Sequence, residues 1–223
     1  YLAGKHGIHP TYIQMLTSDN RHSDQQIFDS IKFLSKIKSS SYNHQSLKES
    51  IYISEKEVSG KWNATNWLKN KDVLIIGSGP SLIKNKSKIL TFIKNKKPKV
   101  LFLNLNNVFP EKIALATIIS HQERIVTEIT LYKKLIKPII IPLNRLEPEL
   151  KLKLRKNKIY DYSLTLRDNT FKINSNGCVL NWSLAFSYAL SIVTEANVNN
   201  IYLAGFDGYY KHDHRQIEMN DIL

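Results

Sequence analysis

The sequence predicts an α/β fold: a Rossmann-like, mostly parallel sheet with helices on both faces, plus a helical segment at the N-terminal end. From residue 72 onward, short apolar runs typical of buried parallel strands alternate with amphipathic stretches. The first run ends in the glycine-containing turn GSGPS at residues 77–81. Residues 1–60, in contrast, show helical spacing of apolar residues and no strand alternation.

The N-terminal segment is predicted to form helices. Four apolar residues recur at helical spacing between residues 23 and 37: Ile27, Ile31, Leu34 and Ile37. Ser23 or Asp24 is suited to cap this helix, and residues 44–51 suggest one more short helix. We place the boundary between this segment, residues 1–60, and the sheet domain, residues 61–223, and expect any oligomer to form through the segment.

The sheet domain contains five apolar runs that we expect to be strands: residues 72–77, 99–105, 114–120, 137–143 and 200–207. Four amphipathic or apolar stretches between them are expected to be helices: residues 81–95, 123–135, 147–155 and 179–196. Strands that alternate with helices predict a parallel sheet covered on both faces.

Composition limits the function classes. The 223 residues are 42% hydrophobic and 23% charged, which is typical of a globular protein, and no apolar run approaches the length of a membrane span. The lone cysteine, Cys178, indicates a reducing, cytoplasmic setting, and we expect it to be a small buried residue. The net charge of +13 comes mostly from scattered lysines. We therefore expect no nucleic-acid binding, but attraction to an anionic sugar, a nucleotide or a membrane surface.

The turn at residues 77–81 is the strongest candidate for a ligand site, because ligands of open parallel sheets bind at the carboxyl ends of strands. Gly77 and Gly79 allow close backbone approach, and Pro80 suits the first turn of a helix. The N–H groups of the turn and the side chains of Ser78 and Ser81 would then face a phosphate. The motif is not a dinucleotide fingerprint, because Leu82 stands where a third glycine is needed.

Three further polar segments are expected to contribute to this site. Asn104 and Asn106 follow the second strand, where their amides can read a base or a sugar hydroxyl. Asp207 lies just beyond the last strand. The sequence NSNG forms a polar turn that we expect to feed a helix, and it comprises Asn174, Ser175, Asn176 and Gly177.

Taken together, GSGPSL, NSNG and IYLAGFDGY resemble the bacterial sialyltransferase-like family and the related motility-accessory and pterin diphosphokinase-like domains, over residues 71–210. The resemblance implies a modified Rossmann sheet that binds a CMP-sugar donor, with the donor phosphate on residues 77–81 and the nucleotide or sugar on Asn104 or Asn106. It also places residues 174–177, Asp207 and Tyr209 at the nucleotide. NSNG departs from the usual threonine-serine-glycine of the family, which leaves the identity of the sugar open.

The transfer chemistry needs a general base, and histidine is the usual choice because its pKa is near working pH. His212 and His214 follow the Asp207 turn and are the candidates, although both also fit a solvated histidine-rich loop. Arg124 is the candidate contact for a phosphate or a sugar carboxylate, or else a surface arginine at a helix start. We expect no metal site and no tightly bound cofactor.

Residues 1–50 include YLAGKHGIHPTYIQML, which resembles the stretch after the barrel in 4-hydroxy-2-oxovalerate aldolase and its relatives. This resemblance implies the C-terminal part of a longer, bifunctional protein, whose barrel, metal ligands and catalytic base would lie before Tyr1. Lyase activity would need that barrel. His6 and His9 are therefore expected to be structural.

Three hypotheses follow. The first is a nucleotide-sugar-dependent glycosyltransferase that passes a CMP-activated, sialic acid-like keto-acid sugar to a glycan acceptor in surface polysaccharide or glycoconjugate synthesis. The second is a pterin diphosphokinase-like enzyme, which would use ATP with magnesium and more carboxylates than Asp207 alone. The third is a non-catalytic module that binds a nucleotide or serves as an assembly domain of the aldolase.

Overall fold

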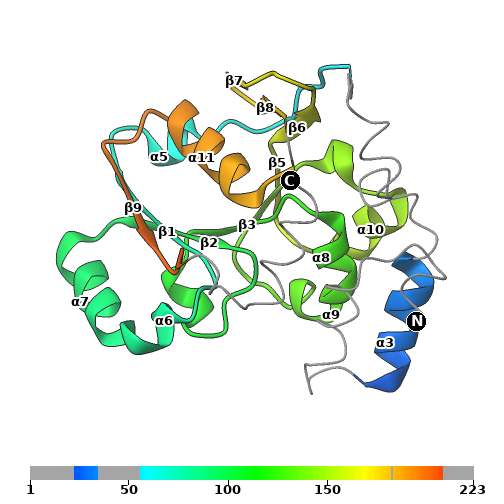
Figure 1. The fold of residues 1–223 in the computed structure, drawn as a ribbon, viewed down its shortest axis with the longest axis horizontal. Helices are drawn as coiled ribbons and strands as arrows, with labels where there is room; N and C mark the ends of the chain where they lie inside the picture. Colours follow the sequence, from blue (N-terminus) through cyan, green and yellow to red (C-terminus); the bar gives the residue numbers. More distant parts are fainter. Residues whose placement is uncertain (1–22, 35–55, 182, 208–223) are drawn as a thin grey trace.

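The computed structural model describes residues 23–34, 56–181 and 183–207 and confirms the α/β prediction (Figure 1). Six parallel strands form the main sheet: β1 (Asp72–Ile76), β2 (Lys99–Leu103), β3 (Ala116–Ile118), β4 (Ile139–Ile141), β5 (Ile159–Asp161) and β9 (Asn200–Ala204). Their order is β5-β4-β3-β2-β1-β9. The chain therefore moves in one direction from β1 to β5 and then returns to the other side of β1.

Helices surround this sheet. The described α-helices are α3 (Asp24–Leu34), α5 (Thr65–Leu68), α6 (Ser81–Lys84), α7 (Lys86–Lys96), α8 (Gln122–Thr127), α9 (Ile129–Tyr132), α10 (Pro148–Lys153) and α11 (Ala185–Glu195). Two 3-10 helices, η1 (Glu111–Ile113) and η2 (Leu143–Arg145), follow β2 and β4. None of these helices is long and apolar enough to cross a membrane.

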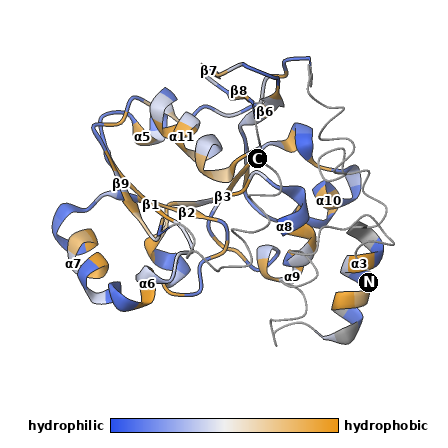
Figure 2. Cartoon of the chain, in the orientation of Figure 1, coloured by the Kyte–Doolittle hydropathy of each residue, from blue (hydrophilic) through white to orange (hydrophobic). Residues whose placement is uncertain are grey.

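Alternate residues of each strand enter opposite layers of the core. Val73 and Ile75 pack with α5 and α11 on one face, whereas Leu74 and Ile76 pack with α6 and α7 on the other. Further along the second face, β4 packs against α8, α9 and α10. Figure 2 shows the result as hydrophobic central strands flanked by helices of mixed hydropathy. Both faces are covered, as the near-continuous apolar runs predict.

Two expected helices are each divided in two. Residues 81–95 form α6 and α7, separated at Asn85, where the backbone leaves the helical region and the side-chain amide donates to the carbonyl of Ser81. Residues 123–135 form α8 and α9, separated at Glu128. The sequence spacing predicted the helical residues but not these breaks, because local hydrogen bonds decide where each helix stops.

The stretch 179–196 is not one helix, contrary to the prediction. Residues Gly177–Leu180 form β8, and α11 begins only at Ala185. Strand β8 pairs with β6 (Ser163–Leu166) and β7 (Lys172–Asn174) in a second, three-stranded sheet that the sequence did not predict. Residues 177–180 are fully buried and contribute to the core, so pairing with β6 overrides the apparent helical continuity.

The helix predicted near residue 23 is present as α3, and it packs on the sheet domain. Ile27 and Ile31 contact the apolar cluster formed by β4 and α8–α10, and the Ser30 hydroxyl donates to the carbonyl of Val126 at 3.5 Å. The remaining part of the N-terminal segment, including His6 and His9, lies outside the described residues.

Candidate functional site

The turns after β1 and β9 meet at the point where the strand order reverses. Because the chain runs from β1 to β5 on one side and then returns to β9, the crevice at the carboxyl ends of β1 and β9 is the topological switch point. Helix α11 begins at this edge, where the Phe186 ring lies 4.7 Å from that of Phe206. The structure thus brings the predicted turn and Asp207 together.

The backbone N–H groups of the turn are largely used within the chain. Gly77 donates to the carbonyl of Ala204 and Gly79 to that of Gly205, each at 2.9 Å. The N–H of Ser81 donates to the Asp207 carboxylate, also at 2.9 Å. We expected these groups to face a phosphate. Among the described residues, only Ser78 keeps both its N–H and its hydroxyl without a hydrogen-bond partner in this turn.

The glycines at positions 77, 79 and 205 are required because the turns after β1 and β9 lie very close together. A β-carbon at Gly77 or Gly79 would lie 2.7 Å from the carbonyl oxygen of Gly205. Gly205 in turn has a φ of +74°, and a β-carbon there would lie 2.7 Å from the Leu82 side chain. Close packing between the two turns therefore explains these glycines without any ligand.

Asn104 and Asn106 have different environments. The Asn106 amide is engaged through both its nitrogen and its oxygen: it donates to the carbonyl of Gly77 at 3.2 Å and accepts from the N–H groups of Val108 and Phe109. Asn104 adopts a left-handed backbone with φ 63°, and its N–H donates to the carbonyl of Ile118. Only 9% of the residue is exposed, and its buried side-chain oxygen has no hydrogen-bond partner among the described residues. A buried oxygen of this kind calls for a donor.

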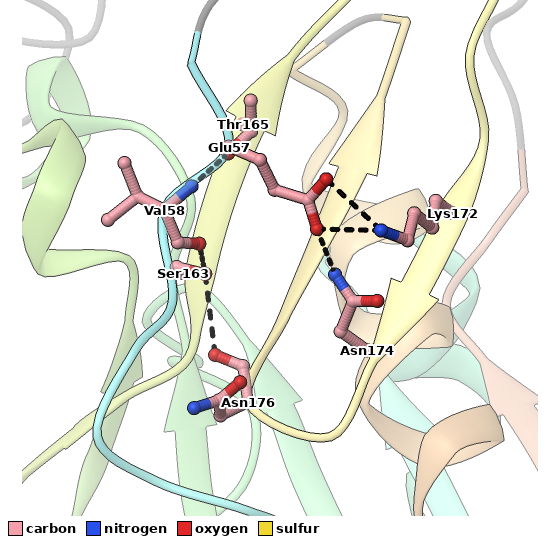
Figure 3. A network of polar contacts seen from close by, with 7 residues as sticks. All are labelled: Glu57, Val58, Ser163, Thr165, Lys172, Asn174 and Asn176. Atoms are coloured by element: carbon pink, nitrogen blue, oxygen red, sulfur yellow. Dashed lines mark hydrogen bonds and ion pairs between the residues drawn. The ribbon is translucent and has the colours of Figure 1, made fainter.

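The NSNG turn does not join this site. Figure 3 shows Asn174 donating to Glu57 at 2.6 Å, with Lys172 bound to the same carboxylate at 3.0 Å. Asn176 donates to the carbonyl of Gly60 at 2.8 Å and leads into β8. The turn lies beyond the end of β5, four strands from β1, or about 19 Å at about 4.8 Å per strand.

Three of the four NSNG residues, Asn174, Asn176 and Gly177, make close contacts within the chain. A β-carbon at Gly177 would collide with the Ser163 side chain, so this glycine is required by packing, and Ser175 is exposed. The Lys172 hydrogen bond, followed by that of Asn174, lowers the pKa of Glu57. The structure therefore does not bring residues 174–177 beside GSGPS.

Basic side chains gather at the ends of β3 and β4. His121 follows β3, Arg124 lies on α8, and Arg145 ends η2 after β4. Burial, followed by the charges of Arg124 and Arg145, lowers the pKa of His121 to about 4. Burial also raises the pKa of Glu123, and the positive charge of Arg145 partly offsets this increase. The sequence predicted a role for Arg124 but not the convergence of these groups.

Other predicted residues are either remote or not described. Tyr209, His212 and His214 lie outside the described residues, which themselves contain no group of three or more His, Cys, Asp or Glu side chains suited to a metal ion. Cys178 is buried on β8, as expected, and burial raises its pKa to about 12.

Comparison with known proteins gives no family for this chain: no family model, curated protein or solved structure matches it. The fold class and the geometry of the carboxyl edge therefore define what can be argued about its function.

Proposed function

We propose that this domain is a nucleotide-sugar-dependent glycosyltransferase whose donor is a CMP-activated acidic keto sugar. The observation that carries the proposal is the buried, unpartnered side-chain oxygen of Asn104 at the carboxyl end of β2. This strand is next to β1, so the oxygen lies beside the switch point where parallel sheets bind nucleotides. The exocyclic amine of cytosine or a ribose hydroxyl supplies the missing donor.

The donor would lie along the carboxyl edge from β1 toward β3. At the β1 end, the N–H and hydroxyl of Ser78 would bind the phosphate, because the Gly77, Gly79 and Ser81 N–H groups are already used. At the β3 end, Arg124 would bind the carboxylate of the sugar. The two ends are two strands apart, or about 10 Å, which suits a nucleotide sugar.

The reaction would proceed by attack of an acceptor hydroxyl on the anomeric carbon. The new carbon–oxygen bond forms as the bond between the anomeric carbon and the phosphate oxygen breaks, and CMP leaves with that electron pair. The hydroxyl proton passes to a general base. His212 and His214 remain the candidates for this base.

Calorimetric titration with CMP tests the proposal, and Asn104→Gly is the informative variant. Glycine tolerates the left-handed backbone of residue 104, so this change removes the amide without adding strain. We expect CMP to bind wild-type protein in excess EDTA and to bind the variant about 10-fold more weakly, or about 1.4 kcal/mol. Asn197→Gly is the matched control, because Asn197 is exposed, has a φ of 52° and follows α11 at the opposite edge of the sheet.

The outcomes separate the three hypotheses. Magnesium-dependent binding of ATP without binding of CMP would contradict the transferase and favour the kinase. Binding of neither nucleotide would contradict both enzymes and favour an assembly domain. Equal affinity of the Asn104 and Asn197 variants for CMP would show that the nucleotide does not contact Asn104.

A further inference from the structure

The ends of β3 and β4 form a polar surface of their own, two and three strands from the glycine turn. Strand β3 pairs with β4 through Thr117 and Ile118, and the N–H of Ile119 continues the pairing by donating to the carbonyl of Ile140 at 3.0 Å. Ser120 and His121 follow β3 along the chain, and η2, which contains Arg145, follows β4. The topology thus brings these side chains to one edge.

Positive charge is concentrated at this edge. Arg124 and Arg145 both lie close enough to His121 to disfavour its protonated form. Glu123 is buried near Arg145 and offsets part of its charge. The guanidinium of Arg124 has no hydrogen bond or ion pair within the described part of the chain. The topology therefore brings two guanidinium groups, those of Arg124 and Arg145, to this edge.

An unmet hydrogen bond lies at the same place. Ser120 is 4% exposed, and within the part of the chain that the structure describes its hydroxyl has no hydrogen-bond partner. Buried hydroxyl groups are normally paired, so this one calls for a ligand atom or an ordered water. A hydroxyl donor and a guanidinium both suit an oxyanion, which accepts hydrogen bonds from each.

We propose that Ser120, His121, Arg124 and Arg145 form a subsite for a small oxyanion, a carboxylate or a phosphate, at the carboxyl ends of β3 and β4. Arg124 supplies the charge and donates to the anion, Ser120 donates its hydroxyl, and His121 presents a neutral imidazole. Arg145 adds positive potential. This subsite refines the proposed function, because it names the receptor for the anionic group of the sugar. Its test needs no nucleotide and can succeed where CMP binding fails.

NMR titration of the full chain with pyruvate and, separately, inorganic phosphate tests the subsite, since chemical shifts report weak binding. We expect at least one anion to bind and Arg124→Gln to weaken it about 10- to 100-fold, the range of a charge-assisted hydrogen bond. Arg155→Gln is the matched control, because Arg155 is exposed beyond α10, near the start of β5. Ser120→Ala is a second variant that keeps every charge, and we expect it to weaken the same anion about 3- to 10-fold.

The two anions distinguish the source of the ligand group. Preference for pyruvate identifies a carboxylate of the sugar or of a keto acid, whereas preference for phosphate identifies the nucleotide phosphate. Binding should also move the imidazole resonances that His121→Gln removes. Binding of neither anion would overturn the subsite, because only water would then remain as a partner for Ser120. Equal weakening by the Arg124 and Arg155 variants would also overturn it, because the anion would then be attracted only by the general positive charge of the protein.

Discussion

His121 makes a defined prediction about the dependence of stability on pH. Its pKa is lowered from an ordinary 6.5 to about 4 in the folded protein. Between these values the unfolded chain binds the proton and the folded chain does not, so the free energy of unfolding falls as pH falls. Well above pH 6.5 the histidine is neutral in both states and has no effect on this slope. This difference between the two pKa values corresponds to about 3 kcal/mol, most of which is lost by pH 4.

Urea denaturation at pH values from 4 to 8 measures this loss, with His121→Gln as the comparison. Glutamine has no titration in this range, and the other six histidines of the chain are common to both proteins. We expect the difference in unfolding free energy between the two proteins to be constant above pH 7.5 and to change by about 3 kcal/mol by pH 4. A difference that stays constant over the whole range would refute the reasoning, since it would place His121 in water with an ordinary pKa.

Two further predictions concern the packing of the core and the switch point. Gly79→Val should reduce the free energy of unfolding by about 1–3 kcal/mol, because the new β-carbon would lie 2.7 Å from the carbonyl oxygen of Gly205. Thermal unfolding measures this loss, with Ser78→Val at an exposed position as the control. An equal loss of stability in both variants would contradict the prediction. Tyr188→Phe should cost about 1–2 kcal/mol, because the buried Tyr188 hydroxyl donates to the carbonyl of Tyr162, which would lose its partner. Unchanged urea denaturation of the Tyr188 variant would show that water replaces the hydroxyl.

Much of the sheet could be predicted because its strands are marked locally. The runs at residues 72–77 and 99–105 are apolar, short and bounded by glycine or asparagine, which is how buried parallel strands appear. Strand β5 has no such run, since Ile159–Asp161 is only partly buried. The second sheet escaped prediction because residues 177–180 join an apolar stretch that continues into α11, and only pairing with β6 makes them a strand.

The candidate site was predictable to a similar degree. Asp207 could be placed beside the glycine turn because ends of neighbouring parallel strands meet, although nothing local showed that its carboxylate would bind Ser81. The turn formed by Asn106 did have a local signal, because its oxygen accepts from the N–H two residues on, as asparagine often does in turns. The convergence of His121 with Arg145 depends on the pairing of β3 with β4, which no spacing along the chain shows.

The position of Asp207 bears on where an anionic ligand can bind. Its carboxylate already accepts the Ser81 N–H, and like charges repel, so a phosphate placed directly on residues 79–81 would have to displace it. At the ends of β3 and β4 the charged groups differ, since Arg124 and Arg145 converge there and burial raises the pKa of the nearby Glu123. Asp207 at the switch point and the guanidinium groups two strands away together favour a ligand whose phosphate contacts Ser78 and not residues 79–81, and whose acidic sugar group lies near β3. Such a ligand would also lie beside the end of β2, where it would donate a hydrogen bond to the buried side-chain oxygen of Asn104. Its acidic group would bind Arg124.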